Sequence, residues 1–280
     1  MRLRKLSQNK TVPVKKMIKS LLALLFTAVV CNPFQATAGN PGGAHYSAES
    51  GNIFWFVLIS DTHMGESGSA DSDNLGWAVN EAVDIIEPEF VINLGDLTDQ
   101  HPFGSNQDTG QWNDYRAIVD HAGMGNIYNG VPVYSDVPGN HDQYHENPPL
   151  ANYLIHSIQG RATNSTQRSW LFEPGFGKYH FVTVASPDPD MTSPVWDFLN
   201  GCPGEISHDE HTFIMNALSD SANVDADLTF VFGHHGLGQA WGSIEIGLTD
   251  FVSTLGQFGV SMYAYGHTHA DSYEPPYFED

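Results

Sequence analysis

The sequence predicts an α/β fold in which a largely parallel or mixed sheet is covered by helices. Short apolar, β-rich runs alternate with segments whose apolar residues repeat at helical spacing, and this alternation is typical of strands joined by crossover helices. The five main predicted strands are Ile53–Ser60, Phe90–Leu94, Val131–Val137, Leu228–Phe232 and Val260–Tyr265. Residues 176–186 form one more run of this kind.

Four segments between or beside these strands predict helices. Their apolar side chains repeat at helical spacing over residues 75–86, 112–119, 213–218 and 251–255. Pro88 ends the first of them, because proline cannot continue a helix. Ser207 and Glu210 fit a capping box ahead of the third. Residues 143–178 are rich in Asn, Pro and Gly, and we expect them to lie over the sheet as loops or a cap.

The first 38 residues read as a secretory signal peptide. A basic stretch precedes the apolar run Leu21–Val30, and Ala36-Thr37-Ala38 fits a small-residue cleavage site. The apolar run is too short for the roughly 20 residues of a membrane-spanning helix, so no stable membrane anchor is expected. The sequence therefore predicts an exported protein, periplasmic or extracellular, with a linker at 39–52 and one domain at 53–280.

Removal of residues 1–38 makes the chain strongly acidic. Four basic residues then remain against 33 acidic ones, a formal charge of −29. Such a surface repels nucleic acid and anionic membranes, so nucleic acid is an unlikely partner. Cys202 is then the single cysteine left in residues 39–280, which excludes an intrachain disulfide and a cysteine-based metal site in the exported protein.

Each of the five main predicted strands runs into residues that can ligate a metal or transfer a proton. The clusters are Asp61-Thr62-His63, Gly95-Asp96-Leu97-Thr98-Asp99, Gly139-Asn140-His141-Asp142, Gly233-His234-His235 and Gly266-His267-Thr268-His269. In open α/β sheets, ligands bind beyond the carboxyl ends of the strands. We therefore expect all five clusters to converge on one crevice.

The spacing within the clusters favours shared ligation. In extended chain, side chains at i and i+2 point to the same face, so Asp61 and His63 can bind one ion together, as can His267 and His269. A glycine before a ligand allows a sharp turn and a close approach of the backbone. The donors are imidazoles, carboxylates and one amide, which suit Mn, Fe, Zn or Co. Their number fits two ions rather than one.

In this order, the series D-x-H, G-D-x-x-D, G-N-H-D, G-H and G-H-x-H resembles the calcineurin-like metallophosphoesterase superfamily. The resemblance covers about residues 53–269. It implies a four-layer α/β/β/α sandwich, with two mixed sheets packed face to face and a dinuclear metal site at the carboxyl ends of the strands.

The resemblance also assigns roles to nine residues. The ligands of one metal would be Asp61, His63 and His269. The ligands of the other would be Asn140, His234 and His267, with Asp96 bridging the pair. His141 matches the catalytic histidine, and Asp99 matches the carboxylate that orients it. His235 has no match, and we expect it at the rim of the site.

The expected function is hydrolysis of phosphate esters by a metal-bridging hydroxide, with His141 as the acid that protonates the leaving oxygen. The expected partner is a small phosphorylated substrate, and monoester, diester, nucleotide and lipid headgroup all remain open. Oligomeric state is open as well. The alternative is a metal-binding scaffold of the same fold with little or no catalysis.

Residues Ala270–Asp280 are the last of the sequence, and they raise a separate expectation. The family places further strands after the H-x-H turn, but Pro275-Pro276 disfavours a central strand there. A loose His269 and an uncovered sheet edge would follow. Either another segment fills this edge, or the sequence is a C-terminally truncated fragment of a longer protein. We expect the 280-residue chain to bind one metal much more weakly than the other, or to self-associate.

Overall fold

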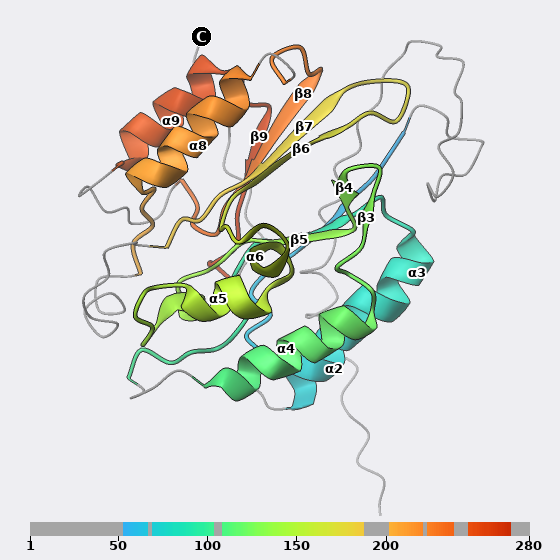
Figure 1. The fold of residues 1–280 in the computed structure, drawn as a ribbon, viewed down its shortest axis with the longest axis vertical. Coiled ribbons are helices and arrows are strands. Elements are labelled where there is room, and N and C mark those ends of the chain that lie inside the picture. The colour runs from blue at the N-terminus through green and yellow to red at the C-terminus, as the bar shows by residue number, and fades with distance from the viewer. Residues whose placement is uncertain are drawn as a thin grey trace, which may run out of the picture.

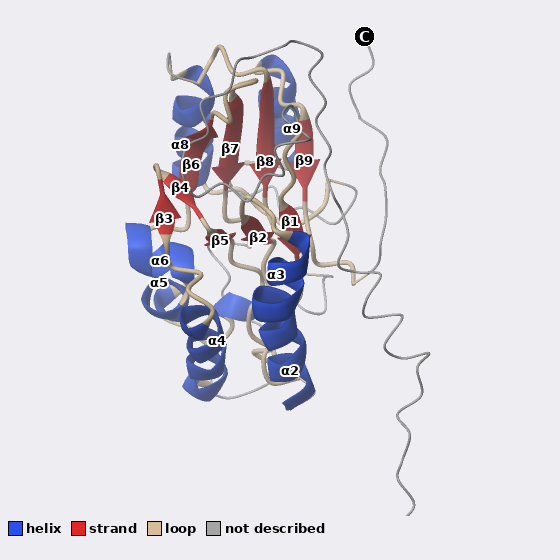
Figure 2. Cartoon of the chain, turned by 90° about the vertical axis from the view of Figure 1, so that its right-hand side faces the viewer, coloured by secondary structure: helices blue, strands red, loops and turns tan. Residues whose placement is uncertain are grey.

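The computed structural model describes residues 53–66, 69–103, 108–187, 202–220, 223–237 and 246–269. Two sheets pack face to face in this part of the chain, and helices cover the outer face of each (Figures 1 and 2). The predicted four-layer α/β/β/α sandwich is thus confirmed. The predicted signal peptide, the linker and the end of the chain lie outside the described residues. Among the residues described, no helix has the length and apolar character to cross a membrane.

The first sheet is parallel, and its helical layer comes from the N-terminal half of the domain. Its strands are β1 (Val57–Ile59), β2 (Val91–Asn93) and β5 (Tyr134–Asp136), in that order. Helices α2 (Ser69–Trp77), α4 (Thr109–His121), α5 (Ala151–His156) and α6 (Ile158–Thr163) cover its outer face (Figure 2). Alternate residues of β1 separate the two sides, because Val57 and Ile59 join this outer core.

The helix predicted around residues 75–86 exists and starts earlier than its apolar stripe. Helix α2 continues through a π-helical turn, Ala78–Ala82, into α3 (Val83–Ile86). Glu87 follows with a left-handed backbone, φ 50°, ahead of Pro88. The predicted stop before the proline is therefore confirmed.

The second sheet is mixed. Strands β7 (Tyr179–Thr183), β8 (Leu228–Phe232) and β9 (Met262–Ala264) are parallel, whereas β6 (Arg168–Phe172) runs antiparallel to β7. Helices α8 (His208–Ser219) and α9 (Leu248–Gln257) cover its outer face (Figure 1). A small hairpin of β3 (Ile127–Tyr128) and β4 (Val131–Pro132) lies apart from both sheets in the pairing.

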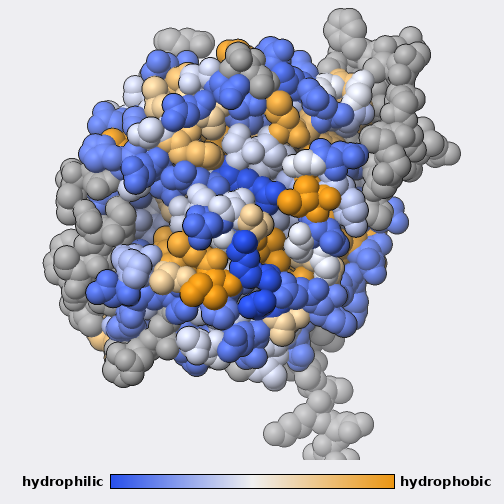
Figure 3. Space-filling view, in the orientation of Figure 1, coloured by the Kyte–Doolittle hydropathy of each residue, from blue (hydrophilic) through white to orange (hydrophobic). Residues whose placement is uncertain are grey.

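The core between the two sheets is mostly aromatic. Phe56 and Phe90 reach it from the first sheet, and Phe181, Phe230 and Phe232 reach it from the second. Phe181 contacts both sides, with ring centroids 4.8 Å from Phe90 and 5.0 Å from Phe230. Large rings fill the space between sheets with little conformational freedom, so this layer fixes how the two sheets sit on each other. Outside this core, the face seen in Figure 3 is largely polar, with separate apolar patches.

Three sequence-based expectations need correction. Residues 143–178 are not only loops, because they hold α5, α6 and β6. The predicted strand Val131–Val137 is divided into β4 and β5. The capping box is half formed: the Ser207 hydroxyl accepts from the backbone N–H of Glu210 at 3.0 Å, but the Glu210 carboxylate turns away to accept from Thr166 Oγ1. The Glu210 carboxylate thus bonds to a residue distant in sequence, Thr166, instead of the backbone N–H of Ser207.

Asp136 carries a buried hydrogen-bond network at the end of β5. Its carboxylate accepts from Tyr115 Oη at 2.8 Å and from the backbone N–H groups of Ile158 and Gln159, each at 2.8 Å. Burial raises the pKa of Asp136, although these donors lower it. The network anchors the start of α6 and one residue of α4 to the first sheet.

We expect Asp136→Asn to lower the free energy of unfolding by about 2–4 kcal/mol, because an amide nitrogen would face donors and leave buried groups unpaired. Urea unfolding of the metal-free protein measures this. Asp114→Asn, on the exposed side of α4, is the matched control and should change little. Equal midpoints for the two variants would contradict the role given to Asp136.

His180 predicts a pH dependence of stability. It is buried on β7 beside Ser169, with Nε2 2.8 Å from Oγ, and burial lowers its pKa to about 4. The unfolded chain therefore binds a proton below about pH 6.5 that the folded chain binds only near pH 4. Stability should fall as pH drops through this window, and His180→Gln should make the fall smaller. Thermal midpoints between pH 7 and 4.5, with chelator present, check it; parallel curves for both proteins would refute it.

Candidate metal centre

The five predicted clusters do meet at one edge of the sandwich, where the parallel strands of both sheets end. Backbone hydrogen bonds join the exits of neighbouring strands, from Asp61 to the carbonyl of Gly95 at 2.9 Å and from Gly266 to that of His234 at 3.0 Å. A third link crosses between the sheets, because the backbone N–H of His267 donates to the Asp61 carboxylate at 3.0 Å. The exits of the strands are thus fixed relative to one another.

Four donors form one compact group, made of Asp61, His63, Asp96 and His269. The Nε2 atoms of His63 and His269 are 3.0 Å apart, and Asp61 Oδ1 lies 3.3 Å from His269 Nε2. The side chain of His269 is 55% exposed, whereas that of His63 is 5% exposed. This group therefore faces solvent on the His269 side.

A second group surrounds Nε2 of His234. That nitrogen lies 3.1 Å from Asp96 Oδ2, 3.2 Å from Asn140 Oδ1 and 3.2 Å from His267 Nδ1. The other ring nitrogen, Nδ1, lies 2.8 Å from the carbonyl oxygen of Leu94 and must donate to it. In the neutral ring this bond fixes the tautomer and leaves the Nε2 lone pair free to ligate.

Asp96 belongs to both groups, as a bridging ligand must. Its Oδ2 is 3.6 Å from His63 Nε2 and 3.1 Å from His234 Nε2. Its Oδ1 accepts the backbone N–H of His141 at 2.9 Å, which fixes the carboxylate plane. Gly139 allows this approach, because a Cβ there would lie 2.2 Å from Asp96 Oδ1.

The backbone under the candidate ligands is not extended, which corrects the argument from i, i+2 spacing. Positive φ angles occur at Asp61 (53°), His63 (42°), Asp96 (50°), His267 (69°) and His269 (50°). Side chains other than glycine adopt this left-handed region at a cost in free energy, and such residues gather at functional sites. The paired side chains converge because of these turns rather than because of the strand period.

His141 and Asp99 lie beside the first group, as the resemblance implied. Asp99 Oδ1 is 3.2 Å from Nδ1 of His141 and 3.2 Å from Nδ1 of His63. Hydrogen bonds from these two imidazoles lower the pKa of Asp99. Burial lowers the pKa of His141, but the Asp96 and Asp99 carboxylates raise it more, so the ring tends to stay protonated.

Asp142, to which no role was assigned from the sequence, holds the loop after β2 and the loop after β5 together. Its carboxylate accepts from the backbone N–H groups of Leu97 at 3.1 Å, Thr98 at 2.9 Å and Gly139 at 2.8 Å. Burial and the nearby Asp96 raise its pKa to about 6. Thr98 Oγ1 also donates to this carboxylate, at 3.0 Å. These four donors are recognisable only in three dimensions, because the last residue of G-N-H-D gives no sign of them.

His235 is not at the rim, so that expectation is wrong. The side chain is fully buried, with Nδ1 3.0 Å from Ser186 Oγ and its ring 4.6 Å from that of His267. Ser186 Oγ also accepts the backbone N–H of His234 at 3.0 Å. His235 and Ser186 therefore pack against His234 and His267 and help to hold them in place. In the sequence, His235 was visible only as a second imidazole next to His234.

The charges of the site fit cations. Burial lowers the pKa of His234, but Asp96 and Asp61 raise it to about 9. Burial raises the pKa of Asp96, but His234 and His141 hold it well below its usual value. The carboxylates are therefore stabilised by positive charge nearby. Ring nitrogens of different histidines also lie at hydrogen-bond distance from one another, as in the pairs His63–His269 and His234–His267. Imidazole and carboxylate donors in this arrangement suit divalent transition metals.

Comparison with known proteins gives one curated relative. Residues of this chain are 31% identical over 147 positions to Transmembrane protein 62 of Mus musculus. The match covers 49% of this chain and spans about a fifth, 21%, of that protein's length.

Two solved structures resemble the fold. A dimetal phosphatase from Danio rerio gives a TM-score of 0.50 at 16% identity, over 76% of this chain and 81% of that one. A putative 5'-nucleotidase from Staphylococcus aureus, solved with alpha-ketoglutarate, gives 0.42 at 15% identity, over 79% and 46%. At the level of sequence, the pattern of the calcineurin-like phosphoesterase family matches residues 54–271, which contain every candidate ligand described above. The chain belongs to the calcineurin-like phosphoesterase family.

Proposed function

We propose that this protein hydrolyses phosphate esters at two cations held by the two donor groups. The observation that carries the proposal is Asp96, whose carboxylate lies between an Asp–His–His group and an Asn–His–His group. Bound cations supply Lewis-acid polarisation of the phosphoryl oxygens and lower the pKa of a bound water. Membership in a phosphoesterase family supports the reaction class, and Mn, Fe, Zn or Co all suit the donors.

The balanced reaction needs one proton donor from the protein. The oxygen of a water bonds to phosphorus and releases one of its protons to solvent, the ester P–O bond breaks, and the leaving alkoxide takes a proton from the protein donor, which is then reprotonated from solvent. His141 is placed for this step, because its Nδ1 faces Asp99 and its Nε2 is left to donate. Asp99 fixes the ring orientation and stabilises the imidazolium.

The cations must supply the positive charge of this site. Three of the four basic residues of the domain pair elsewhere: Arg116 and Arg161 with Asp120, and Lys178 with Asp225. Arg168 lies over the ring of Trp170, with 6.0 Å from Cζ to the ring centroid. We infer a small phosphorylated substrate rather than a nucleic acid, because the rest of the surface is acidic. Export through the N-terminal segment completes the proposal.

Metal content gives the first prediction here. Elemental analysis of the purified protein should approach about two ions per chain, since two donor groups share one carboxylate. Asp96→Asn should lower occupancy of both positions, whereas Asp114→Asn should leave both filled. Saturation of the wild type at a single ion would show that the donor groups do not act as two sites.

His141 gives the second. His141→Ala should keep the metal content and lower kcat on glucose 6-phosphate, whose alkoxide leaving group needs a proton, by roughly 10²–10⁴, the usual worth of a positioned proton donor. His121→Ala, at the exposed end of α4, is the control and should retain full activity. Loss of metal in His141→Ala would mean that the imidazole is a ligand.

The same assays separate catalysis from a scaffold role. Wild type loaded with Mn²⁺ should release p-nitrophenol from p-nitrophenyl phosphate or from bis(p-nitrophenyl) phosphate, and the faster reaction identifies monoester or diester preference. Two bound ions without turnover of either compound would favour the scaffold.

A further inference from the structure

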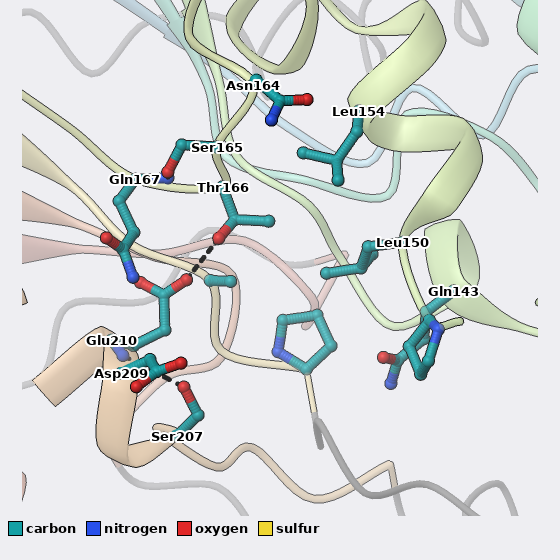
Figure 4. A pocket seen from close by; sticks show the side chains of 13 residues that line it. Gln143, Leu150, Leu154, Asn164, Ser165, Thr166, Gln167, Ser207, Asp209 and Glu210 are labelled. Carbon is teal, nitrogen blue, oxygen red and sulfur yellow. Dashed lines mark hydrogen bonds between the residues drawn. The ribbon is translucent and has the colours of Figure 1, made fainter. Parts of the chain in front are cut away.

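A cavity of about 380 Å³ lies at the functional edge of the second sheet. Because β6 runs antiparallel, the segment before it, residues 164–167, reaches the edge at which β7 exits towards Ala185 and Pro187. Both segments line the cavity, together with the start of α8 and residues of α5 (Figure 4). The volume is in the range of small-molecule sites.

Two short segments connect the cavity to the second donor group. Gln143 lines the cavity and lies three residues after Asn140, in the 3₁₀ turn that also carries His141. Residues three apart in a 3₁₀ turn lie on the same side. On the opposite wall, Ala185 and Pro187 flank Ser186, whose hydroxyl accepts the backbone N–H of His234.

The walls of the cavity differ in chemistry. Leu150 and Leu154 form an apolar side, and Thr166 and Glu210 lie across from them (Figure 4). Glu210 is 5% exposed; its Oε1 accepts from Thr166 Oγ1, and hydrogen bonds from the Ala185 backbone and the Gln167 side chain also lower the pKa of this carboxyl. Asp209 adds a second carboxylate, and none of the described residues that line the cavity is basic.

The Glu210 carboxylate does not take the position that the start of helix α8 offers it. A completed capping box would direct its carboxylate to the backbone N–H of Ser207 at the start of α8. It turns instead to the cavity wall, where burial raises its pKa to about 7. A carboxylate in the wall of a cavity favours a neutral or positively charged occupant over an anion.

We propose that this cavity is the subsite for the organic group of the phosphate ester. It accepts a hydroxyl-bearing group of sugar size that is neutral or positively charged, and it rejects groups that carry a further negative charge. Leu150 and Leu154 pack against the C–H surface of that group, while the carboxylates of Glu210 and Asp209 attract positive charge and repel anions. The proposal rests on the proposed function, because the phosphoryl group is held at the cations.

Three phosphomonoesters test the charge rule: glucosamine 6-phosphate, glucose 6-phosphate and 6-phosphogluconate, which are cationic, neutral and anionic in the organic group. With Mn²⁺-loaded wild type, kcat/KM for the first two should exceed that for the third by about tenfold or more, since the carboxylates of the wall repel an anionic group. Glu210→Gln should reduce this preference by about the same factor. Glu89→Gln, at the amino end of β2 outside the cavity, is the matched control.

A second pair of variants tests the space. Leu154→Trp should fill the cavity and raise KM for glucose 6-phosphate by about tenfold or more, because the sugar loses its apolar contact. The inhibition constant of inorganic phosphate should be the same for Leu154→Trp and for the wild type, since phosphate needs only the cations. Ile155→Trp adds the same side chain at the next position of α5, which is 56% exposed, and should leave both values unchanged.

Calorimetric titration measures the binding of the three esters without relying on turnover, so the subsite can be tested separately from the proposed hydrolase activity. If neither p-nitrophenyl phosphate nor bis(p-nitrophenyl) phosphate is hydrolysed, the hydrolase proposal fails, and the order of binding of the three esters and its loss in Glu210→Gln still decide the subsite. If either compound is hydrolysed but the three esters bind equally, or Glu210→Gln and Glu89→Gln behave alike, the subsite is overturned. Weak binding of all three esters overturns it too.

Discussion

The carboxylate of Asp142 holds the loop after β2 against the loop after β5, and the rest of the metal centre depends on that contact. Three backbone N–H groups from both loops donate to it in a fully buried setting. Asp96 lies immediately before Leu97 and Asn140 immediately after Gly139, so their positions follow from these hydrogen bonds. The left-handed backbone at Asp96 can persist because the chain on either side of it is fixed.

The two sheets divide the ligands between them. Asp61, His63, Asp96 and Asn140 follow strands of the first sheet, and His234, His267 and His269 follow strands of the second. Both donor groups therefore draw on both sheets, and the aromatic layer sets the spacing across which they meet. A bound cation cross-links the sheets, and its binding free energy adds to the stability of the folded state.

Much of this arrangement could be predicted from the sequence, for physical reasons that differ between residues. Strand β8 ends at Phe232 as predicted, because a run of aromatic and β-branched residues stops at Gly233. The candidate ligands were predictable because each follows such a strand. The exact strand ends, however, depend on pairing: β1 is only three residues long, although the apolar run from Ile53 is longer.

Other features depend on contacts that the sequence does not display. Strand β6 was missed because Arg168 and Ser169 interrupt the alternation of apolar residues, and its pairing with β7 decides its conformation. Burial of His235 results from the packing of Ser186 and Gly204 around it, far away in sequence. Glu210 looked like a local cap, and the tertiary contact with Thr166 is invisible in one dimension.

The antiparallel direction of β6 has a consequence for how this protein can change over evolutionary time. A parallel strand contributes only the residues that follow it to the functional edge, and after β1, β2, β5, β8 and β9 those residues include the candidate ligands. Strand β6 contributes the residues that precede it, and none of these is a candidate ligand. On the proposed function, substitutions in residues 164–167 would therefore alter which molecules are admitted without changing any candidate metal ligand.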